Sequence, residues 1–121
     1  MRLAELAIDT VDRFVVARLD GEIDLSNAAD LGATIANRVP NDALVVVIDL
    51  AKVDYVDSAG IHVLFVLRNR LRTRGQELRL VVPPGLEIFE ALRIAFVPSV
   101  VPVFESVEAA IGATDEREPA H

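Results

Sequence analysis

Residues 43–50, Ala-Leu-Val-Val-Val-Ile-Asp-Leu, form an apolar run that is rich in β-branched side chains. A run of this length and composition predicts a strand that is buried on both faces. Strands of this kind occur in sheets whose faces are covered by other elements, and they leave little surface for contact with a partner. Functional residues are therefore expected where the strand ends and in the loops beyond it.

A helix is predicted from Ser58 to Arg74, because apolar residues recur at roughly helical spacing and Gly75 follows as a stop. Ser58 falls at the start of this helix, where backbone N–H groups lack partners and the helix dipole favours negative charge. A phosphoryl group on the Ser58 hydroxyl would be stabilised there. The position would therefore tolerate a phosphate, although a serine there also suits an N-cap.

The remaining segments alternate between strand and helix patterns. Residues 3–8 and 14–19 are predicted to pair as a hairpin around a polar turn at 9–13. Helices are predicted at 26–38, with Ser26 as N-cap and Pro40 beyond the end, at 86–96, and at 106–111, with Ser106 as N-cap and Gly112 as the end. A further strand is predicted at 78–82, and Pro98 and Pro102 bracket a short extended piece. The order predicts an α/β domain with mostly parallel central strands and an antiparallel element at the start.

Composition limits the class of protein. A chain of 121 residues that is 52% hydrophobic is long enough for one folded domain. No apolar stretch approaches the roughly 18 residues that span a bilayer, and the first residues lack the apolar core of a secretory signal, so neither a membrane location nor export is expected. The absence of cysteine excludes disulfides and is compatible with the cytosol. The polar residues 113–121 are expected to form a disordered tail.

The chain carries 12 basic and 19 acidic residues, a formal net charge of −7. Such a charge repels nucleic-acid phosphates, so direct binding to DNA or RNA is not expected. It favours a partner with a basic surface, although an acidic surface is also a common means of staying soluble. The sequence therefore leaves the meaning of the charge open between these two interpretations.

The run 47–50, Val-Ile-Asp-Leu, followed by 55–61, Tyr-Val-Asp-Ser-Ala-Gly-Ile, resembles the signature of the STAS domains of bacterial anti-sigma factor antagonists. Residues 21–25, Gly-Glu-Ile-Asp-Leu, resemble the turn before the first helix of that family, and residues 78–83 resemble its next strand. The resemblance covers roughly residues 8–112. It implies a single STAS-like domain, residues 1–112, with a small mixed sheet and about four helices. One departure is residues 92–97, where family members often have a turn that contains glycine.

The resemblance also implies a function. The unmodified domain would bind an anti-sigma factor that is a serine kinase and so free a sigma factor, while phosphorylation of Ser58 would block binding. ATP and Mg²⁺ would belong to the kinase, a phosphatase would reset the switch in the cytoplasm, and the domain itself would be a substrate without a cofactor, not an enzyme. The alternative is a STAS-type scaffold or ligand-binding subunit of a stress-signalling or transport complex.

The partner-binding residues expected on this basis are Asp24, Asp57, Ser58, Ala59, Gly60 and His62. Four of them have a structural alternative. Ser58 or Asp57 would also serve as an N-cap, Gly60 would allow tight packing on the sheet, and Asp24 and Asp57 would also suit solvated turns. Asp24 lies near Asp57 only if the two loops share one end of the sheet.

Three further features of the sequence bear on the site. His62 follows Ser58 by four residues, but serine–histidine catalysis also needs an orienting group and oxyanion donors, so an exposed position near the contact surface is expected instead. The arginines at the end of the second helix suit its negative dipole end and leave a minor case for an acidic partner; they are Arg68, Arg70, Arg72 and Arg74. Tyr55 is expected in the core or in the wall of the site.

Overall fold

The computed structural model describes residues 2–113. Along this part of the chain, strands and helices follow one another as β1 (Glu5–Val11), β2 (Phe14–Ile23), α1 (Ala28–Arg38), β3 (Val45–Val56), α2 (Ser58–Thr73), β4 (Glu77–Val81), α3 (Glu87–Ile94), the 3₁₀ helix η1 (Val97–Ser99), β5 (Val103–Phe104) and α4 (Val107–Gly112). Of the predicted tail, only Ala113 lies within the described residues.

The strands form one five-stranded sheet in the order β1-β2-β3-β4-β5. β1 and β2 are an antiparallel hairpin, and each later strand runs parallel to its neighbour. Within the described residues, four α-helices accompany the sheet. The predicted α/β fold with a mixed sheet is confirmed.

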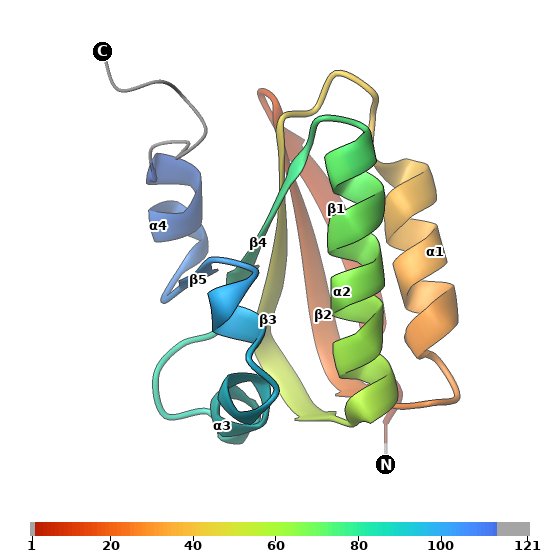
Figure 1. The fold of residues 1–121 in the computed structure, drawn as a ribbon, viewed down its shortest axis with the longest axis vertical. Coiled ribbons are helices and arrows are strands. Elements are labelled where there is room, and N and C mark those ends of the chain that lie inside the picture. The colour runs from red at the N-terminus through yellow and green to blue at the C-terminus, as the bar shows by residue number, and fades with distance from the viewer. Residues whose placement is uncertain (1, 114–121) are drawn as a thin grey trace.

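Side chains of β3 alternate between two cores. Val46, Ile48 and Leu50 face the main core, which also receives buried side chains from α1, α2 and α3. Val45 and Val47 face a smaller core beneath α4. Figure 1 shows α1 and α2 on one side of the sheet and α4 on the other. β3 is therefore buried on both faces, as its apolar run predicted.

β3 is longer than predicted, because residues 51–56 continue as a strand where the sequence analysis placed a loop. They pair in parallel with the end of β2, and the register joins Gly21 to Val53 and Ile23 to Val56. Irregularities in this register, between Arg18 and Asp20 and again after Gly21, let the pairing continue. The two strands therefore end side by side, immediately before the segments that hold Asp24 and Ser58.

Other boundaries differ from the predictions as well. β1 continues to Val11, through most of the predicted turn at 9–13, and β2 continues to Ile23 rather than ending at residue 19. α1 begins at Ala28 rather than at Ser26, and no side chain caps it. The Ser26 hydroxyl is bonded to Asp24 instead, which removes it from the capping role. Residues 97–99, including Pro98, form the 3₁₀ helix η1 rather than part of an extended piece, so only Val103 and Phe104 add a strand there. Ser106 caps α4 as predicted, since its hydroxyl accepts a hydrogen bond from the Ala109 N–H at 3.1 Å.

Residues 2–4, near the amino-terminal end of the chain, pass closely over Gly21. The Ala4 N–H donates to the Glu22 carbonyl, and the Glu22 N–H donates to the Arg2 carbonyl, both at 2.9 Å. Gly21 has a φ of +131°, and a Cβ at this position would lie 2.9 Å from the Ala4 Cα. Residues 2–4 are thereby fixed against the end of β2.

Phe96 has a left-handed backbone conformation, in the segment where the sequence departs from the resemblance. Its φ is +62° and its side chain is 73% exposed. A bulky residue pays roughly 1–2 kcal/mol for this conformation, and little burial compensates for it here. The departure noted at residues 92–97 therefore leaves a strained turn after α3.

Replacing Phe96 with glycine is expected to raise the free energy of unfolding by about 0.5–1 kcal/mol, because relief of strain exceeds the added backbone entropy of the unfolded chain. Urea unfolding measures the change. Phe96→Ala is the control, since it removes the exposed ring but keeps the unfavourable φ. An alanine variant at least as stable as the glycine variant would contradict the strain.

Candidate functional site

Ser58 is the first residue of α2, and its side chain is exposed. The N-cap of the helix is Asp57, whose Oδ1 accepts a hydrogen bond from the Gly60 N–H at 3.0 Å. Of the two capping alternatives, the structure therefore selects Asp57. The Ser58 hydroxyl stands at the surface beside the positive end of the helix dipole.

Asp57 also joins the start of α2 to the loop between β2 and α1. Its Oδ2 accepts a hydrogen bond from the Leu25 N–H at 3.1 Å, and its own N–H donates to the Ile23 carbonyl at 3.2 Å. Asp24 immediately precedes Leu25, so the two loops share one end of the sheet. Asp24 therefore lies near Asp57, which the sequence predicted only on the condition that the two loops meet.

The carboxylate of Asp24 is held within its own loop. It accepts hydrogen bonds from the Ser26 hydroxyl and, at 2.8 Å, from the Ser26 N–H. The bond from the hydroxyl is the main cause that lowers the pKa of Asp24, and the backbone bond adds to it. Asn27 closes the loop by accepting from the Asp24 N–H and donating to the Glu22 carbonyl. Asp24 therefore adds a fixed negative charge to the site at neutral pH.

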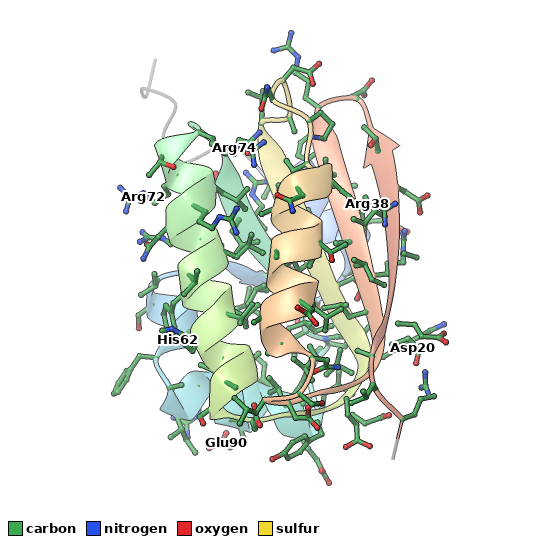
Figure 2. The ribbon with its side chains drawn as sticks, turned by 90° about the vertical axis from the view of Figure 1, so that its right-hand side faces the viewer. Asp20, Arg38, His62, Arg72, Arg74 and Glu90 are labelled. Atoms are coloured by element: carbon green, nitrogen blue, oxygen red, sulfur yellow. The ribbon has the colours of Figure 1, made fainter. Side chains whose placement is uncertain are left out.

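The three residues after Ser58 that were expected to bind a partner lie in different environments. His62 is exposed on α2, in the helical layer that faces the viewer in Figure 2. Ala59 is partly buried against the main core. Gly60 is buried, and an added Cβ would lie 2.5 Å from Cγ2 of Val56 and 2.9 Å from Cγ2 of Ile23.

Gly60 is thus a packing residue in this fold, and its assignment to the partner surface stays a prediction. Its missing side chain lets the first turn of α2 approach the ends of β2 and β3. Asp57 and Ser58 keep their positions because this turn packs closely on the sheet. The close approach was the alternative interpretation of Gly60 in the sequence.

An open hollow of about 520 Å³ lies beside Ser58, at the ends of β2 and β3. Its wall combines carboxylates with two exposed apolar or aromatic side chains: Leu25 is 82% exposed and Tyr55 is 46% exposed. The lining residues are Glu22, Asp24, Leu25, Ser26, Tyr55 and Asp57. A surface of this kind suits a protein partner that offers basic groups around an apolar contact.

Sequence reasoning missed the roles of Glu22 and Leu25 in this surface. Leu25 is an apolar residue between the polar Asp24 and Ser26, and this pattern could have indicated an exposed contact residue in the loop. Tyr55 was expected in the core or in the wall, and the structure places it in the wall. Its exposure follows from the continuation of β3, which extends to Val56.

Comparison with protein families matches residues 5–110 to the family described as STAS domain. The match covers most of the chain, including every strand and α1 to α3. This chain belongs to the STAS domain family. Ser58 of this STAS domain stands at the junction between β3 and α2, and the hollow lies next to it.

Relatives of this STAS domain include named regulators. BtrV of Bordetella bronchiseptica, which is named as an anti-sigma factor antagonist, is 36% identical over 111 residues, which are 90% of this chain and 93% of BtrV. The crystal structure of an anti-sigma factor antagonist from Mycobacterium paratuberculosis has a TM-score of 0.78 at 20% identity. The match covers 89% of this chain and 91% of that chain. The phosphorylated form of SpoIIAA from Bacillus has a TM-score of 0.65 at 19% identity, with 88% of this chain and 96% of that chain covered. The two structures confirm the fold.

Two further findings concern the described part of this STAS domain. Residues 2–113 contain no group of three or more His, Cys, Asp or Glu side chains that is placed to hold a metal ion. No helix in the same range is long and apolar enough to cross a membrane. His121, the second histidine of the sequence, lies outside the described residues.

Proposed function

We propose that this STAS domain is an anti-sigma factor antagonist that is controlled by phosphorylation of Ser58. The unmodified domain binds an anti-sigma factor with serine kinase activity, which releases a sigma factor. The phosphorylated domain does not bind. The observation that carries the proposal is the exposed Ser58 hydroxyl at the start of α2, beside a hollow that suits a protein partner. The name of the relative BtrV supports the same class of function.

The fold tolerates a phosphate at this position. Ser58 belongs to the first turn of a 16-residue helix, where N–H groups and the dipole favour negative charge. The Ser58 side chain is exposed, so a phosphate displaces no core residue. Modification therefore changes the surface and leaves the packing of Gly60 on the sheet intact.

A phosphate on Ser58 has a larger effect on the surface that binds the partner. A phosphate adds about −1.5 to −2 charges next to the carboxylates of Asp57 and Asp24. A surface that closes over a neutral hydroxyl would have to remove water from this dianion, and the neighbouring acidic groups offer it no counter-charge. Loss of affinity on phosphorylation follows from these two costs.

The catalytic chemistry belongs to the partner under this proposal. The sequence has no phosphate-binding loop of the Gly-x-x-x-x-Gly-Lys type. The anti-sigma kinase supplies ATP and Mg²⁺, and the domain is its substrate. A phosphatase restores the hydroxyl, and the cycle takes place in the cytoplasm, where sigma factors act.

Incubation of the full chain with its anti-sigma kinase and Mg²⁺-ATP is expected to add one phosphate, which intact-mass spectrometry and peptide mapping place on Ser58. Ser58→Ala is expected to abolish the addition. Ser26→Ala is the matched control, since Ser26 is also exposed but its hydroxyl is bonded to Asp24. A phosphate that persists in Ser58→Ala, or that never forms on the unaltered chain, would overturn the proposal.

A further inference from the structure

The carboxyl-terminal half of α2 carries two arginines, Arg68 and Arg72, one helical turn apart. Side chains at this spacing share one face of a helix. Within residues 2–113, neither guanidinium forms an ion pair, whereas Arg2, Arg18, Arg79 and Arg93 all do. Arg13, Arg38, Arg70 and Arg74 also form no ion pair within these residues, so Arg68 and Arg72 are distinguished by the hollow that they line together.

Both arginines line a hollow of about 260 Å³ between α2 and the β4 edge of the sheet. Leu78 and Gln76 are buried residues of its lining, and Val100 and Pro102 add apolar wall. The Gln76 side chain is fixed, because its Nε2 donates to the carbonyls of Pro40 and Ala43 at 2.9 and 3.0 Å. In Figure 2, Arg72 projects from the side of α2 that is away from α1. The part of the lining that Gln76 and Leu78 form is therefore fixed in place by the fold.

Glu77 is the acidic residue of the lining, but its charge is offset. Its Oε2 accepts a hydrogen bond from the Nε of Arg79 at 2.7 Å, and Arg79 is buried on the opposite side of β4 from Leu78. Two positive charges thus face the hollow without an opposing free carboxylate among the described residues. The balance favours an anion of charge −2.

Helix capping does not account for the two arginines. The last carbonyls of α2 already accept backbone hydrogen bonds, since Leu71 receives the Gln76 N–H at 2.9 Å and Arg72 receives the Gly75 N–H at 3.0 Å. Arg74 has a separate role, because its guanidinium donates to the carbonyls of Ala36 and Val39 at the end of α1. The Arg68 guanidinium donates to Oδ1 of Asn69 at 3.3 Å through Nη1, which leaves its other N–H groups for an anion, and the Arg72 guanidinium has no hydrogen-bond partner within residues 2–113.

We propose that this hollow binds a small phosphomonoester. The phosphate dianion sits between the guanidinium groups of Arg68 and Arg72, and a compact apolar part of the ester lies against Val100 and Pro102. Guanidinium groups recognise phosphate oxygens through paired N–H donors, which matches this lining. The site is about the length of α2 away from Ser58, roughly 20 Å at 1.5 Å per residue. It is independent of the proposed function.

Titration of the ¹⁵N-labelled full chain with phenyl phosphate tests the site by NMR. Saturable shifts are expected at the amides of residues 68–78 and 100–103, with a dissociation constant of about 1 mM or lower. Arg68→Gln and Arg72→Gln are each expected to weaken binding by at least about tenfold. Arg70→Gln is the control, because Arg70 lies on the same helix but lines the α1–α2 groove instead.

Three results would overturn the proposal. Shifts that do not saturate would show that no site exists. Equal weakening by Arg70→Gln would indicate attraction to the general charge of the helix end. Equal affinity for inorganic phosphate would show that the apolar wall contributes nothing and that the site does not select an ester. Far-UV circular dichroism of each variant checks that the fold is kept.

Discussion

Replacing Ser58 with aspartate is expected to weaken binding of the anti-sigma factor by at least about tenfold, and full phosphorylation by more. The new charge stands beside Asp57 and near Asp24, at the edge of the hollow lined by Leu25 and Tyr55. A partner that covers this edge must desolvate the charge without a neighbouring cation on the domain. Isothermal titration calorimetry against the cognate anti-sigma factor measures the loss.

Ser58→Ala is the matched control and is expected to bind nearly as tightly as the unaltered domain, because it removes a hydroxyl without adding charge. Leu25→Ala identifies the surface independently. Its side chain is 82% exposed, so its removal costs little stability but is expected to weaken binding about tenfold if the partner covers it. Equal affinity of the serine, alanine and aspartate forms would refute the proposed switch.

Replacing Arg79 with methionine is expected to lower the free energy of unfolding by about 3–5 kcal/mol, the cost of breaking a buried ion pair by removing one partner. Arg79 is 2% exposed, and its Nε lies 2.7 Å from Oε2 of Glu77. Its Nη1 donates to the Ala110 carbonyl at 2.6 Å, and its guanidinium lies 5.8 Å from the centre of the Phe104 ring. The change leaves the Glu77 carboxylate and the Ala110 carbonyl without their hydrogen-bond donor, and it weakens the attachment of α4.

Urea unfolding of two further variants tests this explanation. Arg93→Met removes an ion pair with Glu90 whose side chains are both more than half exposed, and a cost below about 1 kcal/mol is expected. Combining Arg79→Met with Glu77→Gln is expected to restore part of the loss, because the stranded charge is then absent. Similar costs for Arg79→Met and Arg93→Met would contradict a role for burial.

The sequence predicted the parts of the fold that depend on local patterns. The apolar run 43–50 predicted a doubly buried strand, and the spacing of Ile61, Leu64 and Leu71 predicted α2 almost to its last residue. Ser106 was placed correctly as the cap of α4. Each of these features is determined by residues within one element, so the sequence alone contains the information.

The errors arose where distant segments decide the structure. The predicted strand ended at residue 50, where the continuous apolar run stops, but residues 51–56 alternate between polar and apolar side chains and continue the strand because β2 pairs with them to its end. Ser26 is a good cap by type, but Asp24 competes for its hydroxyl. The burial of Arg79, about which the sequence made no prediction, depends on the contact with α4. Tertiary contacts of this kind leave no periodic signal.

The site was predicted in part for the same reason. Asp57 and Ser58 stand within a short motif, and their positions at the start of α2 follow from it. The hollow, by contrast, needs the β2–α1 loop to meet β3, and the hydrogen bond from Leu25 to Asp57 is visible only once the sheet is assembled. The burial of Gly60 also depends on the ends of β2 and β3, because a motif alone does not distinguish a buried glycine from an exposed one.

The passage of residues 2–4 over Gly21 has a practical consequence for anyone who prepares this domain. Figure 1 places the start of the described chain at the same end of the molecule as the first turn of α2, whereas α4 lies toward the other end. A purification tag or a sensor-chip linkage ahead of residue 2 would crowd the face where an anti-sigma factor is expected to dock. Attachment beyond α4 would leave that face accessible.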